Sequence, residues 1–306
     1  MSKYIVKRIV SIIISLFLLT TITFLMMHSI PGGPFTKETK ISPEVEQALL
    51  KKYHLDEPLF NQYIYYVKGL FGFDLGPSMK YKDMSVNELI KIGFPPSAKL
   101  GIIAILLVVF IGIPSGIFSA LKSDKFSDKF ILFISTVGIA VPSFVLATIL
   151  LYIFALKLKV FPMYGITDPK GYILPAIALS GLSMASITRL TRSSMLEILS
   201  QDYIVTAKAK GLKKRKIFFV HALKNALIPI ITVLGPTIAA LITGTFVIEK
   251  IFAIPGMGKH FVNSISNRDY MVIMGVTLFY ALILNIMVLI VDILYAIIDP
   301  RIKIDR

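Results

Sequence analysis

DYIVTAKAKGLKKRKIFFVHALKNALIP, residues 202–229, is too basic to cross a lipid bilayer. It holds seven Lys/Arg and one acid in 28 residues, although apolar runs flank it at residues 173–188 and 227–248. Lys or Arg at mid-membrane costs roughly 2.5 to 3.5 kcal/mol each on insertion scales. We therefore predict a loop between two membrane spans, on the cytoplasmic side, because basic loops are retained there.

The same stretch has the patterning of two helices. Gly211 interrupts it at a point where the chain can turn. A second helical run, residues 213–226, leads directly into the next apolar stretch. Before the glycine, apolar residues recur at helical spacing at Leu196, Leu199, Tyr203, Ile204 and Ala207. This pattern predicts a short amphipathic helix, a turn and a second helix, which together need a surface on which to dock.

The composition is that of an integral membrane protein. The chain has 306 residues, of which 55% are hydrophobic and 17% charged, with a mean hydropathy of +0.76. It has no cysteine, which excludes disulfides and thiolate chemistry. The net charge of +15 is concentrated, with nine Lys/Arg against two acids in residues 189–226. Clustered basic charge indicates topology and contact with anionic lipid, and we do not expect a nucleic-acid partner.

We predict an all-α fold with six membrane spans and both termini in the cytoplasm. The first apolar run is too long for a signal peptide, whose apolar core has about 7 to 15 residues. Three regions follow from this pattern: residues 1–30 with the first span, an external α-rich subdomain at residues 31–96, and a core at residues 97–306 that includes the loop 189–226. The predicted spans are residues 9–30, 97–121, 130–156, 173–188, 227–248 and 271–296.

Residues 31–96 are the long polar segment of the chain. They carry eight basic and eight acidic residues, and turn signals occur at residues 31–34 and 76–77. Helical patterns cover residues 43–53 and 60–71. A segment with balanced charge can be translocated without violating the positive-inside rule, so we place it outside.

Several spans contain helix-packing or helix-breaking residues. Gly112 and Gly116 lie four apart, which predicts a face for close helix contact. Pro142 predicts a kink, and both Pro142 and Pro236 are candidate pathway residues. The fourth span has 16 apolar residues, fewer than the roughly 20 that are needed. We therefore expect it to continue past Arg189 and Arg192 as one rigid helix.

The sequence does not carry an ATP-binding motif. Residues 253–260, AIPGMGKH, resemble a phosphate loop, but Ala253 replaces the first glycine and His260 replaces the hydroxyl residue. The segment instead resembles one that peptide permeases carry between spans 5 and 6, and this resemblance implies that Gly256 and Gly258 let the chain turn at the mouth of the transport pathway. We predict that the chain is not an enzyme and holds no cofactor.

No pattern of metal ligands or of a catalytic triad is present. The four histidines, His28, His54, His221 and His260, have no ligand spacing. Asp292 is the carboxylate that we place inside a span, with Asn285 seven residues earlier on the same face. We expect Asp292 to pair with a nearby Lys or Arg, since a proton pathway would place acids in several spans.

The motifs of the basic loop resemble the cytoplasmic coupling loop of ABC importer permeases of the peptide branch. TAKAKG is followed by residues 221–223 and by NALIP at residues 225–229. The general pattern of that family has an E-A-A run, a glycine four residues later and an I-x-L-P ending. Gly211 retains the glycine of this pattern. The E-A-A run is replaced by Val205, Thr206 and Ala207, and the I, L and P of the ending are replaced by His221, Leu223 and Lys224. Two segments of the predicted external subdomain resemble the B-subunit family of oligopeptide permeases. They are PGGPF and KYHLDEPLFNQYIYYVKGLFGFDLGPSMKYKDMSVNELI.

The resemblance implies a type I importer permease in the plasma or inner membrane. Such a chain pairs with a second, related permease, two cytoplasmic ATPase subunits and an external solute-binding protein, and passes oligopeptides. It also implies coupling residues in the loop. Tyr203 and Ala207 would face a groove of the ATPase, Gly211 would set the turn, and Lys208 and His221 would make polar contacts.

Three alternatives remain open at this point. A dipeptide or nickel permease of the same family has the same architecture. An ATP-independent secondary transporter would show inverted repeats, which we do not find. A membrane scaffold would need no glycine-turned loop.

Overall fold

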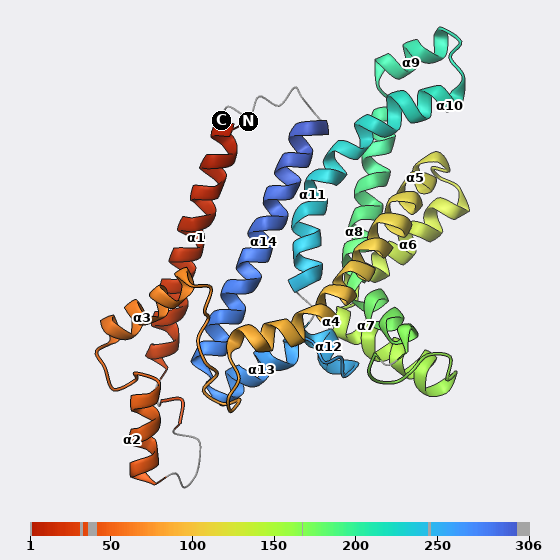
Figure 1. The fold of residues 1–306 in the computed structure, drawn as a ribbon. Helices are drawn as coiled ribbons and strands as arrows, with labels where there is room; N and C mark the ends of the chain where they lie inside the picture. Colours follow the sequence, from red (N-terminus) through yellow and green to blue (C-terminus); the bar gives the residue numbers. More distant parts are fainter. Residues whose placement is uncertain (1, 31–32, 36–41, 167, 244–245, 299–306) are drawn as a thin grey trace. The chain divides into compact units, whose positions relative to one another are not determined.

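Helices form most of this computed structural model, which describes residues 2–30, 33–35, 42–166, 168–243 and 246–298 (Figure 1). The described residues also contain one isolated β-bridge, between Pro77 and Ser85. The chain divides into two compact units, residues 1–97 with 255–285 and residues 98–254 with 286–306. Helices α4 (Val86–Leu107) and α14 (Tyr270–Ile298) begin in the first unit and end in the second.

Apolar helices of membrane-spanning length occur at all six predicted positions. Five stretches of the described residues are long and apolar enough by themselves, and a sixth is the bent pair Phe126–Ala140 and Ser143–Lys157. The five are Ile5–Ser29, Val86–Leu121, Pro169–Leu199, Lys214–Ile251 and Tyr270–Ile293. The apolar side chains of the first are largely exposed, as expected for a helix that faces lipid or a partner subunit.

The first unit contains the helices of the polar segment. Its elements are α1 (Ser2–Ser29), α2 (Pro43–Lys52), α3 (Leu59–Phe71), α13 (Met257–Asn267) and the starts of α4 and α14. Helices α2 and α3 confirm the predictions for residues 43–53 and 60–71. The core of this unit joins segments that are far apart in sequence, through Phe24, Phe35, Tyr66, Met79, Tyr270 and Met274.

A buried carboxylate fastens the loop before α4 to the turn between α13 and α14. Asp269 is fully buried and accepts hydrogen bonds from the Ser78 hydroxyl at 2.5 Å and from the backbone N–H groups of Met79 and Lys80, both at 3.2 Å. A buried carboxylate needs such donors, because unpaired burial of its charge is costly. The sequence analysis did not identify this contact.

The second predicted span starts earlier than expected. Helix α4 begins at Val86, whereas the prediction began at residue 97. The reason is a capping box: the Ser85 hydroxyl accepts from the Glu88 N–H at 3.2 Å, and the Glu88 carboxylate accepts from the Ser85 N–H at 2.8 Å. The helix continues through Pro95 and Pro96.

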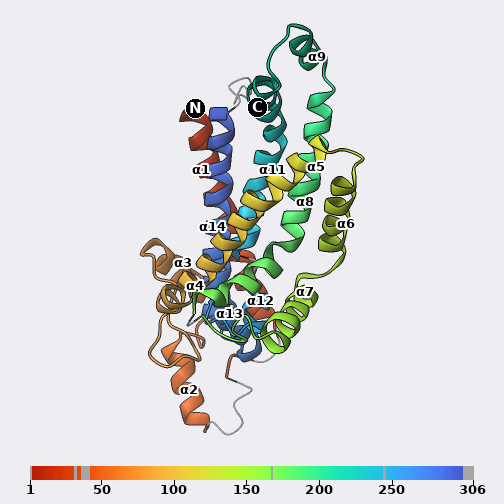
Figure 2. The same ribbon diagram turned by 90° about the vertical axis from the view of Figure 1, so that its right-hand side faces the viewer.

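The second unit is a bundle arranged around a single long helix, α8 (Ile173–Leu199). Helix α8 contacts α5, α6, α7 and α11, and Figure 2 shows α5, α6 and α8 side by side. It runs without interruption through Arg189 and Arg192, which confirms the predicted rigid extension. The other elements are η1 (Val108–Gly112), α5 (Ile113–Leu121), α6 (Phe126–Ala140), α7 (Ser143–Leu150), η2 (Leu151–Lys157), η3 (Pro169–Tyr172), α9 (Asp202–Ala209), α10 (Lys214–Lys216), η4 (Ile217–Ala222), α11 (Leu223–Thr243) and α12 (Phe246–Ile251).

The predicted glycine face lies against α8. The Thr188 hydroxyl donates to the Gly112 carbonyl at 3.1 Å. A Cβ atom at Gly116 would lie 2.6 Å from the Cβ of Thr191, so no larger residue fits without moving the helices. The prediction of a packing seam is confirmed.

The third predicted span is broken at Pro142. Helix α6 ends at Ala140, Val141 is extended (φ −91°, ψ 119°), and α7 begins after Pro142 at an angle of 108° to α6. Proline lacks an N–H group and disfavours the helical conformation of the residue before it. The expected kink is therefore present as a complete break.

Candidate coupling site

The basic loop folds as a helical hairpin at the end of α8 (Figure 1). Gln201 has extended backbone (φ −70°, ψ 147°) and separates α8 from α9. Gly211 has φ +74°, a left-handed conformation that glycine adopts without strain, and it turns the chain toward α10 and η4. A helix, a turn and a second helix are present, and η4 continues directly into α11. The first helix is shorter than predicted, because the break at Gln201 leaves Leu196 and Leu199 in α8.

The hairpin has a hydrophobic core that attaches it to the membrane helices. The side chains come from α5, α8, α9, η4 and α11, so the two arms of the hairpin and the ends of three longer helices share one cluster. The cluster consists of Ala120, Met195, Ile204, Ala207, Ile217, Ala222 and Ala226. Burial of several apolar side chains makes the hairpin a packed extension of these helices.

Ala207 points into this core. Its side chain is 7% exposed, and Ile204, one helical turn earlier, is fully buried. The prediction that Ala207 faces a partner groove is wrong, because residues three apart on α9 share the face that packs against η4. A small residue at this position allows the two arms to approach closely.

Tyr203 connects the two arms by hydrogen bonds. Its hydroxyl accepts from the Asn225 side-chain amide at 3.0 Å and donates to the His221 carbonyl at 3.4 Å. The Asn225 amide also donates to the His221 carbonyl at 3.0 Å. The contact at His221 thus involves its backbone, and Asn225 is a functional candidate that the sequence analysis did not select. The sequence did offer a signal for Asn225, because its amide side chain stands out on a helix that is otherwise apolar and basic.

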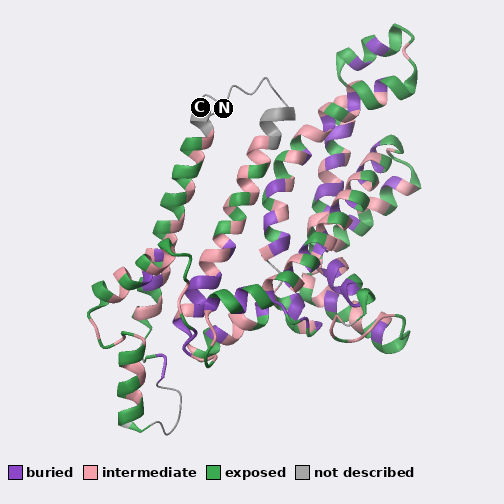
Figure 3. Cartoon of the chain, viewed as in Figure 1, coloured by how far each residue is buried: buried purple, intermediate pink, exposed green. Residues whose placement is uncertain are grey.

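The outer surface of the hairpin is apolar and basic. Its exposed apolar side chains are Val205, Phe219 and Val220, each 55% exposed, and the ring of Tyr203 at 41%. Figure 3 shows much of α9 and α10 as exposed. Lys213, Arg215, Lys216 and Phe219 line a shallow, open depression of this surface. Lys208 is also exposed. Exposed apolar residues surrounded by basic side chains are typical of a protein-interaction surface.

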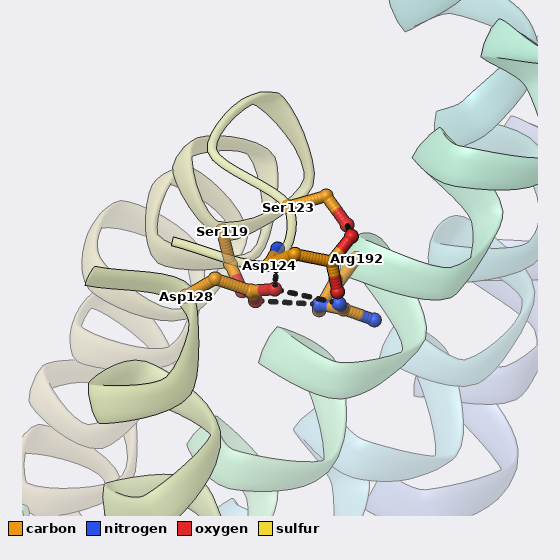
Figure 4. A network of polar contacts seen from close by, with 5 residues as sticks. All are labelled: Ser119, Ser123, Asp124, Asp128 and Arg192. Carbon is orange, nitrogen blue, oxygen red and sulfur yellow. Dashed lines mark hydrogen bonds and ion pairs between the residues drawn. The ribbon is translucent and has the colours of Figure 1, made fainter. Parts of the chain in front are cut away.

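An ion pair holds α8 to the hairpin of α5 and α6 (Figure 4). The two carboxylate oxygens of Asp128 accept from Nε and Nη2 of Arg192, both at 2.7 Å. Asp128 also accepts from the Ser119 hydroxyl at 2.5 Å and from the Asp124 N–H at 2.9 Å. Asp128 is buried, so its charge is balanced by a bidentate partner and two further donors. The sequence analysis treated these residues only as a charged turn and a span end.

The remaining sequence-selected residues lie away from the hairpin. Pro142 and Pro236 are exposed in the second unit. Gly256 precedes α13 as its N-cap and Gly258 is buried within that helix, both in the first unit. Their roles in a pathway stay predictions.

A buried acid that the sequence analysis did not select lies next to a predicted span. Glu249 on α12 is fully buried, whereas Asp292 on α14 is half-buried. Asp292 lies within the candidate span Tyr270–Ile293, in agreement with the prediction. Glu249 lies just beyond the predicted end of its span, at the C-terminal side of an apolar run, where a hydropathy boundary excluded it.

Comparison with known proteins identifies the family. The family described as binding-protein-dependent transport system inner membrane component matches residues 112–304, and its N-terminal part matches residues 1–80. The chain belongs to this family. This permease is accordingly a multi-pass protein of the inner membrane, as its apolar helices require.

Similar proteins align over the full length of the permease. The dipeptide transport system permease protein DppB of Bacillus subtilis (strain 168) is 50% identical over 306 residues, covering 100% of this chain and 99% of DppB. The oligopeptide transport system permease protein OppB of Salmonella typhimurium is 45% identical over 305 residues, covering 99% of this chain and 100% of OppB.

A solved structure supports the fold. The inward-facing MetNI methionine ABC transporter aligns with a TM-score of 0.53 at 15% identity, over 69% of this chain and 97% of that chain. The permease has the type I ABC importer fold.

Proposed function

We propose that the permease forms half of the translocation pathway of an ATP-driven peptide importer. A second related permease, two cytoplasmic ATPase subunits and an external binding protein complete the assembly. The observation that carries this proposal is the helical hairpin, which combines an internal hydrophobic core with an exposed apolar and basic outer surface. The full-length similarity to DppB and OppB, which are named as peptide permeases, supports the substrate class.

The hairpin is built to transmit displacement. Its core joins α9 to α5, α8 and α11, and the Asp128–Arg192 pair fixes α8 to α6. When the ATPases close, a push on α9 therefore moves these helices together. ATP and the loaded binding protein would each favour one of two arrangements of the bundle, which is the thermodynamic requirement for coupling.

Each candidate residue has a role in this mechanism. The ring edge of Tyr203 contacts the ATPase while its hydroxyl holds the second arm, and Lys208 pairs with an acidic group of the ATPase. Gly211 sets the turn, and the His221 carbonyl anchors Tyr203. Ala207 acts from within the core.

Val205→Glu tests the docking surface. Val205 is 55% exposed and outside the hairpin core, so a carboxylate there leaves the fold intact but is expected to abolish ATPase co-purification and peptide uptake. Val160→Glu is the matched control, since Val160 is 57% exposed in the loop between η2 and η3. Normal ATPase binding by Val205→Glu would refute the docking role.

Labelling of single cysteines tests the orientation. The natural chain has no cysteine, so every thiol is introduced. We expect Lys208→Cys to react with an impermeant maleimide only after the cells are opened, and Asn61→Cys to react in intact cells, since both positions are exposed. Reaction of Lys208→Cys in intact cells would place the hairpin outside.

Uptake by the assembled transporter tests the substrate range. We favour oligopeptides, because the sequence of residues 31–96 is the part that resembles oligopeptide permeases. Uptake of labelled tetrapeptides that stops on ATP depletion is expected. Uptake restricted to dipeptides or to nickel would support the alternatives within the family, and uptake that persists without ATP would indicate a secondary transporter.

A further inference from the structure

Helix α3 carries a stripe of apolar side chains on its outer surface. The residues of this stripe are spaced four, three and four apart and therefore share one side of the helix: Phe60, Ile64, Val67 and Phe71. The rings of Phe60 and Phe71 are 72% and 84% exposed, and the other two side chains are half-buried. A different side of α3, which carries the buried Tyr66, packs into the core of the first unit. The stripe is therefore an apolar surface in addition to the one that the fold buries.

The exposed polar groups of α3 lie on another side of the helix. Asn61, Tyr65 and Lys68 are exposed and are spaced four and three residues apart. The ring of Tyr65 stacks against His54 of the preceding loop, with centroids 4.9 Å apart. The exposed surface of α3 is thus divided between an apolar and a polar side. Helices divided in this way lie in the interface between lipid and water, with the apolar side inserted about 5 to 10 Å into the boundary between headgroups and acyl chains.

Contacts within the first unit attach α3 to the C-terminal third of α1 (Figure 1). The hydroxyl groups of Tyr63 and Thr21 form a hydrogen bond of 2.7 Å. The ring of Tyr63 also packs edge-on against Phe24, with centroids 5.2 Å apart. One residue earlier on α3, the side-chain oxygen of Gln62 lies 3.1 Å from Nε2 of His28. These contacts fix the position of α3 along α1.

This position is at the edge of the hydrocarbon layer. The candidate span of α1 is Ile5–Ser29, whose 25 residues extend over about 37 Å, compared with about 30 Å for the hydrocarbon core of a bilayer. His28 lies next to the end of this span, and Thr21 lies about 12 Å before that end. A helix fastened between these two levels lies where acyl chains meet headgroups.

Acyl chains are the partner that fits the stripe at this depth. Ile22, Leu25 and Met26 of α1 lie at the same level and are 53 to 59% exposed. Contact of large apolar side chains with water is unfavourable, and lipid at this depth covers the stripe and the exposed side of α1 together. A soluble partner would have to displace lipid to reach the stripe.

We propose that α3 is an interfacial helix, whose stripe inserts among the acyl chains of the leaflet at the C-terminal end of α1. With residues 31–96 outside, this is the outer leaflet. The insertion itself depends neither on the orientation of the chain nor on its proposed transport function. It gives part of the polar segment a position in the membrane, which the balanced charge of that segment did not predict.

Single tryptophans test the proposal, because the natural chain contains none. Phe60→Trp and Phe71→Trp are made separately in the full-length permease, which is reconstituted in phospholipid vesicles. The acyl chains carry bromine, a contact quencher of tryptophan, either near the headgroups or near the methyl ends. Iodide on both sides of the membrane reports exposure to water. We expect both tryptophans to be quenched by bromine, and more strongly by bromine near the headgroups than by bromine near the methyl ends.

Two control variants calibrate the measurement. Tyr65→Trp lies on the polar side of the same helix, where the natural ring is 51% exposed. We expect iodide to quench it more than it quenches the tryptophans of the stripe, and bromine to leave it unquenched. Leu18→Trp lies near the middle of the α1 span at 53% exposure, and bromine near the methyl ends should quench it most.

Three results would overturn the proposal, and none of them requires measurement of uptake. Quenching of Phe60→Trp and Phe71→Trp by iodide to the extent seen for Tyr65→Trp would show that the stripe faces water. Protection of the stripe from both quenchers would show that protein covers it, in this preparation a second copy of the chain. Equal quenching of Tyr65→Trp and Phe71→Trp by bromine would show that the whole helix is immersed in lipid.

Discussion

Asp128→Ala is expected to destabilise the second unit by leaving Arg192 without its counter-ion. Four hydrogen bonds to the Asp128 carboxylate are lost, two of them from Arg192. Removal of one partner of a buried ion pair costs about 3 to 5 kcal/mol. The Arg192 side chain retains 20% exposure, which allows partial hydration and places the expected loss near the lower figure. With roughly 2 to 4 °C per kcal/mol for a domain of this size, about 3 kcal/mol lowers the melting temperature by about 6 to 12 °C.

Circular dichroism at 222 nm during heating is the appropriate assay, because the chain is helical and contains no tryptophan for intrinsic fluorescence. Asp124→Asn is the matched control. Asp124 lies four residues before Asp128, is exposed, and has φ +66°, which asparagine tolerates. Its loss of charge is expected to change stability by less than about 0.5 kcal/mol.

A double variant separates the ion pair from simple packing. Replacing Asp128 and Arg192 together by Leu and Met removes both charges, and such apolar replacements of buried pairs are often neutral. We expect this variant to recover most of the stability that Asp128→Ala loses. The reasoning is refuted if Asp128→Ala melts like the natural protein, or if the double variant is as unstable as the single one.

Three other predictions follow from the same structure. Gly116→Val is expected to force α5 away from α8 at Thr191 and to lower the melting temperature; an unchanged value would argue against the packing seam. Asn225→Ala removes a donor to the Tyr203 hydroxyl, so hydrogen exchange in α9 should accelerate roughly two- to twelvefold, and unchanged exchange would contradict the connection between the arms. His260→Gln should make the folded protein less sensitive to acid. Burial, and secondarily the charge of Lys259, lowers the pKa of His260 in the folded protein. The unfolded chain therefore binds more protons at this residue, and the free energy of unfolding falls as the pH drops through 6.5. If urea unfolding shows that the natural protein and His260→Gln lose the same stability between pH 7.5 and 5.5, His260 does not cause the acid sensitivity.

Local features of the sequence determined where the helices of the permease lie along the chain. Hydropathy located all six spans, the basic residues marked the loop, and Gly211 marked its turn. The continuity of α8 through Arg189 and Arg192 followed from the shortness of its apolar run. The start of α4 was also readable, from Ser85 and Glu88, and was missed because hydropathy was given precedence over capping.

Only the tertiary structure decided which side chains meet. The Asp128–Arg192 pair joins residues 64 apart, and its existence depends on the rotation and crossing of α6 and α8. Hydropathy does not specify that rotation in a membrane protein, because lipid-facing and core-facing sides are both apolar. The inward orientation of Ala207 has the same cause, since a helix with apolar residues on two faces can present either one. The sequence thus determined where the hairpin lies along the chain, and packing of α9 against α5, α8 and η4 decided which face of α9 remains available to a partner.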